Sequence, residues 1–128
     1  MTLSELDDSL PNGIHDAYLE RLSVSFAEGS VTLGLKLLVS SVGEKARYQD
    51  AEIKASGLLV LVIQGPDGAP TSISEPLGIC SFQTSEQYYP GFSNCAKEIQ
   101  PMFHSFYVEE PWNSYIHIAA ERAEISWQ

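Results

Sequence analysis

Two stretches that alternate between apolar and polar residues constrain the fold of this chain more than any other feature. In residues 18–26, YLERLSVSF, the apolar residues Leu22, Val24 and Phe26 share one parity. Residues 31–39, VTLGLKLLV, repeat the pattern after the link AEGS, whose glycine can adopt a positive φ. A period of two is typical of a strand with one buried face. The two stretches therefore predict an antiparallel β-hairpin.

The middle of the chain predicts further strands. Residues 46–56 have a mixed strand pattern, and Gly57 is expected to break it. The apolar run LLVLVI at residues 58–63 is typical of a strand covered on both faces. The polar sequence SSVGEK at residues 40–45 predicts a turn, and QGPDGAP at residues 64–70 predicts a loop.

The two ends of the chain add one short turn and one or two strands. Residues 3–9 predict at most a short helical turn, and Ser4–Asp7 within them has a capping-box-like spacing with Asp in place of the usual Glu or Gln. Residues 114–127 predict two short strands or one bent strand, with His117 facing solvent or a partner. The fold class that follows is mainly β, an antiparallel sandwich or partly open barrel of about six to eight short strands with little helix.

A long irregular segment interrupts the strand pattern at about residues 71–112. It contains four prolines and eight aromatic residues, with strand-like fragments near residues 78–82 and 102–108. The sequence SNCAKEI within it predicts one short helical turn. Loops this long in compact domains are usually functional or partly disordered. We interpret residues 1–128 as a single β-rich domain that carries this aromatic and proline-rich excursion.

Composition and charge limit the classes of partner. The chain is 44% hydrophobic and 19% charged, which is typical of a globular domain. Its 17 acidic residues outnumber 7 basic ones, and the formal net charge is −10. Such a surface repels nucleic-acid phosphates and anionic membranes, and it attracts basic partners.

The sequence also predicts a cytoplasmic location. The first twenty residues contain no basic segment followed by an apolar one, so no signal peptide is expected. The longest apolar run, at residues 58–63, is too short to span a bilayer. Two cysteines, Cys80 and Cys95, cannot form a disulfide framework and fit a cytosolic protein with free thiols.

The N-terminal third resembles a set of known small domains. Residues 13–17 read Gly-Ile-His-Asp-Ala, and the predicted hairpin follows them directly. This order resembles small uncharacterised bacterial β-rich domains that open with a Gly-x-His-Asp-Ala corner. The acidic, β-rich layout is also similar to that of immunity proteins of contact-dependent toxin systems. The resemblance implies a bacterial binding domain, and it transfers no site residue.

His15 and Asp16 are the first candidates for chemistry. A His-Asp pair can orient an imidazole as a general base or hold a metal. Neighbouring strand residues point to opposite faces, so the pair would converge only if turn geometry continues through it. In the structural interpretation, Asp16 accepts backbone N–H groups at the turn and His15 bonds to a nearby carbonyl.

Other chemistry is not indicated by spacing. His15, His104, His117, Cys80 and Cys95 lack the tight spacings of zinc sites, so no metal is predicted. GICSF is not a nucleophile elbow, and the glycines form neither a dinucleotide-binding nor a Walker pattern. We therefore expect no cofactor, and the protein is more simply explained as a non-enzyme.

The aromatic excursion is the most suggestive feature for function. Large rigid rings beside acidic residues are typical of protein interfaces. The alternative is that the rings fold back and cap one end of the sheet, and the two interpretations are compatible. The predicted contact residues are Tyr88, Tyr89, Phe92, Phe106, Tyr107, Glu109, Glu110 and Trp112.

Three hypotheses follow. The first is a cytosolic binding domain that recognises a basic protein partner through residues 86–115, with an immunity-type role as one version. The second is an enzyme, or a small-ligand or metal-binding protein, with a pocket near His15, Asp16 and a second histidine. The third is a homo-oligomer, for example a homodimer, that associates through exposed strand edges.

Overall fold

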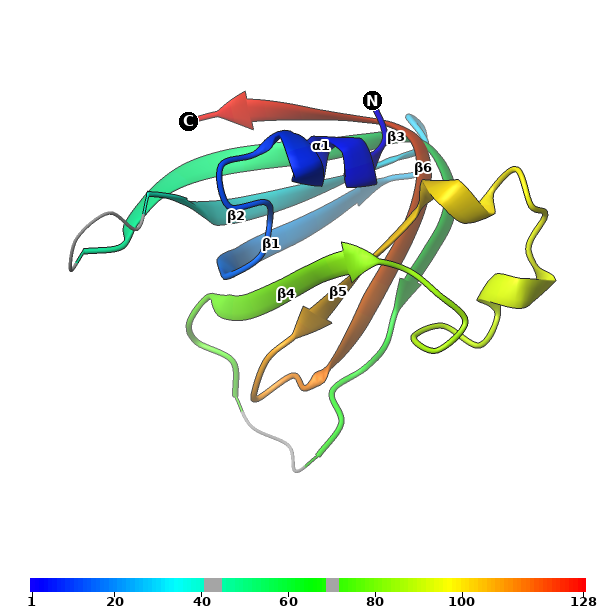
Figure 1. The fold of residues 1–128 in the computed structure, drawn as a ribbon. Helices are drawn as coiled ribbons and strands as arrows, with labels where there is room; N and C mark the ends of the chain where they lie inside the picture. The colour runs from blue at the N-terminus through cyan, green and yellow to red at the C-terminus, as the bar shows by residue number, and fades with distance from the viewer. Residues whose placement is uncertain (41–44, 69–71) are drawn as a thin grey trace.

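Six antiparallel strands form a closed barrel in the computed structural model, which describes residues 1–40, 45–68 and 72–128 (Figure 1). The strand order around the barrel is β1-β2-β3-β6-β5-β4, and β1 returns to pair with β4. The strands are β1 (Ala17–Ser25), β2 (Ser30–Ser40), β3 (Arg47–Ile63), β4 (Leu77–Gln83), β5 (Phe103–Val108) and β6 (Ser114–Trp127). The prediction of a mainly β antiparallel fold is confirmed, and the barrel is closed.

The predicted hairpin is confirmed as β1 and β2. Its register places Leu22 opposite Leu33 and Val24 opposite Val31. The four alternating apolar residues of β2 face the barrel interior and are buried: Val31, Leu33, Leu35 and Leu37. Phe26 was expected on the buried face, but it lies beyond the end of β1 and is 93% exposed. The chain turns before Phe26, so the strand parity no longer governs its side chain.

Strand β3 is longer than the sequence pattern indicates. Gly57 does not end it, because the residue adopts φ +64° inside a continuous strand of 17 residues. A Cβ at Gly57 would lie 2.8 Å from Cβ of Glu121 on the neighbouring β6, so the glycine permits a close approach of the two strands. The register shifts between Leu58 and Val60, where a bulge bends the strand.

The apolar run at residues 58–63 was predicted to be covered on both faces, and this prediction is wrong. Leu59 and Ile63 are 44% and 45% exposed. Of the turn predicted at residues 40–45, residues 41–44 lie outside the described residues. The loop predicted at residues 64–70 follows β3, and its last two residues are likewise outside the described part.

One end of the barrel is closed by the helix α1 (Leu3–Ser9) (Figure 1). Leu3 and Leu6, three residues apart, share the helix face that packs into the barrel core. The capping box is Thr2 with Glu5, whose side chains each accept the other's backbone N–H. The helix occupies the predicted residues 3–9, but its capping box is Thr2 with Glu5 and not the Ser4–Asp7 segment, because Thr-Leu-Ser-Glu has the threonine-to-glutamate spacing that completes the motif.

The irregular excursion is shorter than predicted and covers only residues 84–102. The fragments predicted near residues 78–82 and 102–108 are confirmed as β4 and β5. The sequence SNCAKEI, at residues 93–99, was predicted to form one short helical turn. The structure has two 3-10 turns near it instead, η1 (Phe92–Asn94) and η2 (Gln100–Met102). The excursion lies at the side of the barrel, outside β5 and β6 (Figure 1).

The C-terminal residues form one continuous strand, β6, which pairs with β3 on one side and β5 on the other. Ile116 and Ile118 face the core as predicted. His117 was expected to face solvent or a partner, but it is 0% exposed because the excursion covers this part of the outer face. The described residues include no helix with the length and apolar character needed to cross a membrane.

Candidate binding surface

His15 and Asp16 form an exposed corner at the start of β1. Asp16 adopts φ +61°, so the turn does continue through the pair, and His15 Nδ1 lies 3.1 Å from Asp16 Oδ1. Both side chains are more than half exposed. The backbone carbonyl of His15 accepts a hydrogen bond from Asn12 Nδ2 at 3.1 Å. No described contact brings His104 or His117 to this corner.

His104 belongs to a polar network beneath α1. Its Nδ1 lies 3.0 Å from Ser4 Oγ, and its Nε2 lies 2.6 Å from Ser81 Oγ. The Ser81 hydroxyl donates to Asp7 Oδ1 at 3.2 Å, and Asp7 also accepts the backbone N–H of Ile14 at 2.6 Å. These bonds join the helix, the turn before β1 and two barrel strands.

This network contains Ser, His and Asp but lacks the geometry of a catalytic triad. In a triad the carboxylate holds the imidazole nitrogen opposite the nucleophile. Here Asp7 Oδ2 lies 4.0 Å from Nε2, the same nitrogen that Ser81 contacts. His104 is buried, and the main surface hollows of the described residues are lined by other side chains. We therefore assign it a structural role.

His117 is buried separately, beneath the excursion. Its ring stacks on Tyr115, with 5.6 Å between centroids, and Tyr89 lies 5.0 Å away. Nδ1 is 2.5 Å from the Ser105 hydroxyl, which in turn contacts Thr84 Oγ1. Nε2 has no hydrogen-bond partner among the described residues. A neutral imidazole with one bonded nitrogen fits this environment better than a charged one.

Acid should destabilise the protein through these two buried histidines. Burial lowers the pKa of His104 below its ordinary 6.5, although Asp7 and Asp8 oppose the shift, and burial also lowers the pKa of His117. As the pH falls below about 6.5, the unfolded histidines bind protons that the folded ones do not. The free energy of unfolding should therefore be fully retained above that pH and fall below it, by up to about 1.4 kcal/mol per pH unit for each histidine.

Urea unfolding between about pH 7.5 and pH 5 measures this slope. The double variant His104→Gln/His117→Gln should show a shallower slope even if it is less stable at neutral pH. His15→Gln is the matched control, because it removes an exposed histidine and should keep the wild-type slope. An unchanged slope in the double variant would contradict the assignment.

The predicted aromatic contact residues separate into distinct environments. Tyr88, Tyr89, Phe92 and Tyr107 are half-buried and pack over the outer face of the barrel. Phe106 is only 1% exposed and belongs to the barrel core, so it is not available to a partner. Alternation places Phe106 and Tyr107 on opposite faces of β5, and closure of the barrel makes the Phe106 face the inner one.

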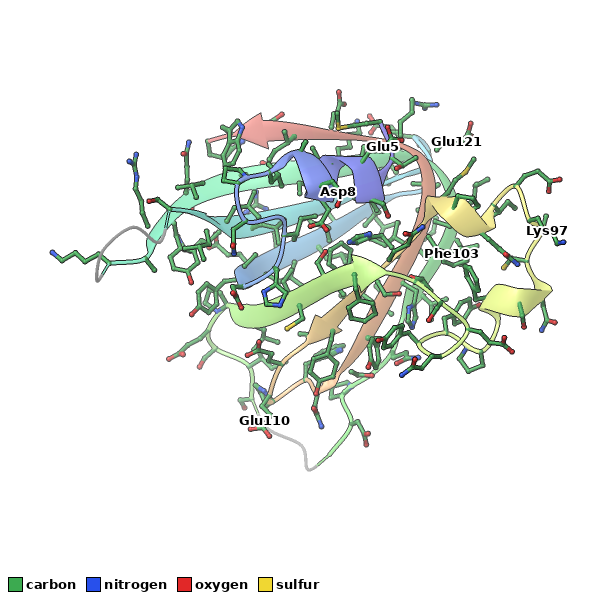
Figure 2. All side chains as sticks on the ribbon, in the orientation of Figure 1. Glu5, Asp8, Lys97, Phe103, Glu110 and Glu121 are labelled. Carbon is green, nitrogen blue, oxygen red and sulfur yellow. The ribbon has the colours of Figure 1, made fainter. Side chains whose placement is uncertain are left out.

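Trp112 and the two predicted glutamates lie at the end of the barrel opposite α1. Trp112 Nε1 donates to the carbonyl of Gln64 at 2.9 Å, which orients the ring beside the end of β3. Glu109 and Glu110 are exposed in the turn between β5 and β6. Figure 2 shows Glu110 at this end of the barrel, while Lys97 projects from the distant excursion.

The structure brings Glu109 together with Asp16 and with two tyrosines that the sequence analysis missed. Asp16, Tyr18, Tyr48 and Glu109 line one shallow hollow, and Tyr18, Glu109 and Glu110 line an adjoining hollow of about 540 Å³. We call these five residues, Asp16, Tyr18, Tyr48, Glu109 and Glu110, the acidic tyrosine surface. Tyr18 and Tyr48 are 40% and 37% exposed, and their rings lie 5.3 Å apart.

Strand pairing explains how this surface forms. Tyr18 pairs with Gly78 across the β1–β4 junction that closes the barrel, and Tyr48 lies opposite Leu38 in the β2–β3 pair. The backbone N–H of Glu109 donates to the carbonyl of Gly78 at 2.9 Å. A Cβ at Gly78 would lie 2.9 Å from Glu109 Oε2, so the glycine lets the carboxylate lie across β4. Tyr48 lies on the outward parity of β3, which was an available sequence signal. Tyr18 has the same parity in the sequence as Leu22 and Val24, and it faces outward because the register shifts between Leu19 and Arg21.

The local potential at this surface is negative. Burial, followed by the charges of Glu109 and Asp16, raises the pKa of the Cys80 thiol. Burial, followed by Tyr18 and Asp16, raises the pKa of Tyr48. Lys36 does not offset these charges, because its Nζ lies 2.8 Å from Asp50 and 3.9 Å from Glu20. A cation would therefore be attracted to the tyrosine rings and carboxylates together.

The described residues contain neither a disulfide nor a group of side chains that could hold a metal ion. Cys80 and Cys95 are both free and half-buried. Within residues 1–40, 45–68 and 72–128, no three His, Cys, Asp or Glu side chains are grouped so that they could hold a metal ion.

No protein-family model, curated protein or solved structure matches this chain.

Proposed function

We propose that this protein acts by binding a basic protein partner in the cytoplasm and has no chemistry of its own. The observation that carries the proposal is the exposed, mutually packed pair Tyr18 and Tyr48, surrounded by carboxylates in a shallow hollow. Arginine and lysine side chains bind favourably over tyrosine faces, and nearby carboxylates add directional hydrogen bonds. The net charge of −10 would accelerate the encounter with such a partner.

The proposed contact surface retains part of the sequence prediction and extends it. Glu109 and Glu110 lie in the acidic tyrosine surface, whereas most aromatic residues of the excursion serve at least partly to cover the barrel. An immunity-type protein that captures a basic toxin is one version of this function. Homodimer formation remains a separate hypothesis, although the pairing of β1 with β4 leaves fewer free strand edges for it.

Affinity capture from the native lysate tests the proposed function. The wild-type chain should retain a basic partner, and the retention should weaken as the salt concentration rises. Tyr18→Ala/Tyr48→Ala should weaken binding at least about tenfold, because buried aromatic anchors often contribute 2 kcal/mol or more. Glu109→Gln/Glu110→Gln should weaken it and reduce its salt dependence.

Phe26→Ala is the matched control, since it removes an aromatic ring that is 93% exposed and lies outside the proposed surface. If the double tyrosine variant retained the same partner as tightly as this control does, the proposed surface would be wrong. The mass of the protein in solution distinguishes the homodimer hypothesis from the proposed function. A homodimer would have twice the mass of the chain without any captured protein.

A further inference from the structure

The two ends of the barrel differ in how they are covered. At one end α1 inserts Leu3 and Leu6 into the core, and Ile14 adds a third buried side chain. At the opposite end, where β3 stops and the β5–β6 turn lies, no helix within residues 1–40, 45–68 and 72–128 covers the interior (Figure 1). Ile63 is 45% exposed there and Leu77 is half-buried. We call this end the barrel mouth.

A cavity of about 200 Å³ opens at the barrel mouth. Its deepest lining residues are Val108 and Ile116, which are almost fully buried. The remaining apolar lining includes Leu19, Leu22, Ile63, Ile73, Leu77 and Trp112. The hydrogen bond from Trp112 to Gln64 holds the indole in place, so this side of the cavity exists before any ligand arrives.

The size of the cavity limits the ligand. An engineered apolar cavity of about 150 Å³ binds benzene, so about 200 Å³ can hold a phenyl or small branched alkyl group. It is too small for most drug-sized molecules, whose sites span about 300–1,000 Å³. The lining therefore suits one compact apolar group.

The rim of the cavity is negatively charged. Glu20 and Glu75 both line it, and both also line an adjoining hollow with Ile73, so the two residues border a common space. Arg21 is the third charged lining residue, and its guanidinium is held 3.0 Å from the carboxylate of Glu52. Lys36 is 3.9 Å from Glu20 and closer to Asp50. The rim thus complements a cation.

We propose that the barrel mouth binds a small apolar molecule with a positive charge, such as an arylalkylammonium or branched alkylammonium compound. The apolar group occupies the cavity between Trp112 and Ile63, and the ammonium group lies at the rim near Glu20 and Glu75. Apolar burial supplies the attraction, and the carboxylates select the charge. This site does not depend on the proposed protein partner.

An NMR titration of the ¹⁵N-labelled chain tests the site with three probes of similar shape, namely 2-phenylethylammonium, 2-phenylethanol and phenylacetate. We expect saturable shifts at Leu77, Val108 and the indole N–H of Trp112. The ammonium compound should bind about tenfold more tightly than phenylacetate, because each of the two rim carboxylates attracts the ammonium group and repels the carboxylate of phenylacetate. Trp127→Phe removes the second indole signal and assigns the first.

Two pairs of variants separate the contributions. Ile63→Ser should weaken all three probes, whereas Leu59→Ser, on the same strand with nearly equal exposure but outside the cavity, should leave them unchanged. Glu20→Gln/Glu75→Gln should abolish the preference for the ammonium probe and leave 2-phenylethanol binding intact. The control with the same change in net charge is Glu86→Gln/Glu98→Gln.

Several results would overturn the proposal. These are the absence of saturable shifts, shifts confined to the acidic tyrosine surface, equal affinity for the ammonium and carboxylate probes, or no effect of Ile63→Ser. A capped Lys-Phe-Lys peptide tests whether the apolar group and the positive charge come instead from the side chains of a protein partner. If it binds more than about tenfold tighter than 2-phenylethylammonium, the mouth is an anchor for a protein side chain and the small-molecule site is wrong.

Discussion

Phe106→Ala should lower the free energy of unfolding by about 3–5 kcal/mol, the range typical of a buried phenylalanine. Phe106 is 1% exposed, lies opposite Ile116 in the β5–β6 pair and packs 5.2 Å from the His104 ring. Truncation would remove its apolar contacts and leave a cavity that the closed barrel can only partly collapse around. Urea denaturation measured by circular dichroism gives the change.

Phe26→Ala is the control, because the same truncation at a 93% exposed position should alter stability by no more than about 0.5 kcal/mol. This comparison also distinguishes a core residue from a contact residue. If Phe106→Ala were as stable as the wild type and lost a binding partner, the sequence-based assignment of Phe106 to a contact surface would be correct and its core position wrong.

Asp7→Ala is the second substitution with a large expected effect, about 2–4 kcal/mol of lost stability. The Asp7 carboxylate accepts the N–H of Ile14 and the hydroxyl of Ser81, and each unmade hydrogen bond of a buried group costs about 1–3 kcal/mol. These bonds attach α1 and the following turn to β4. The variant should also lose protection from amide hydrogen exchange in α1 before the barrel strands do.

Asp8→Ala is its matched control. Asp8 is exposed on the same short helix, and alanine improves helix propensity equally at both positions. Asp7→Asn, which retains an acceptor oxygen, should lose less than half as much stability as Asp7→Ala. Equal stabilities for the Asp7→Ala and Asp8→Ala variants would show that the network does not fasten the helix to the barrel.

Local pattern was sufficient for much of the fold and insufficient for the sites. Leu33 and Leu35 could be assigned to a buried strand face because alternation records which side of a strand meets the core. The same reasoning failed at His117, since it gives the face of the strand but not whether another segment covers that face. The excursion covers it through Tyr89, which is 28 positions away in the sequence.

The candidate site was predictable only in part for a related reason. Glu109 and Glu110 were identified by charge beside aromatic residues, and Asp16 by its pairing with His15. That Asp16, Tyr48 and Glu109 line one hollow depends on the pairing of β1 with β4, which joins residues 17–19 to residues 77–79. No local signal in the sequence specifies that pairing.

The sequence by itself determined the strand-rich class, the hairpin of β1 and β2, the inward residues of β2 and the acidic charge, because periodicity and composition are local properties. Tertiary structure alone decided the closure of the barrel, the burial of Phe106 with the core, the cover over His117 and the open mouth beside Trp112. These depend on contacts between segments far apart in the chain. Such contacts form where the total burial of apolar surface is most favourable, and single segments do not encode that sum.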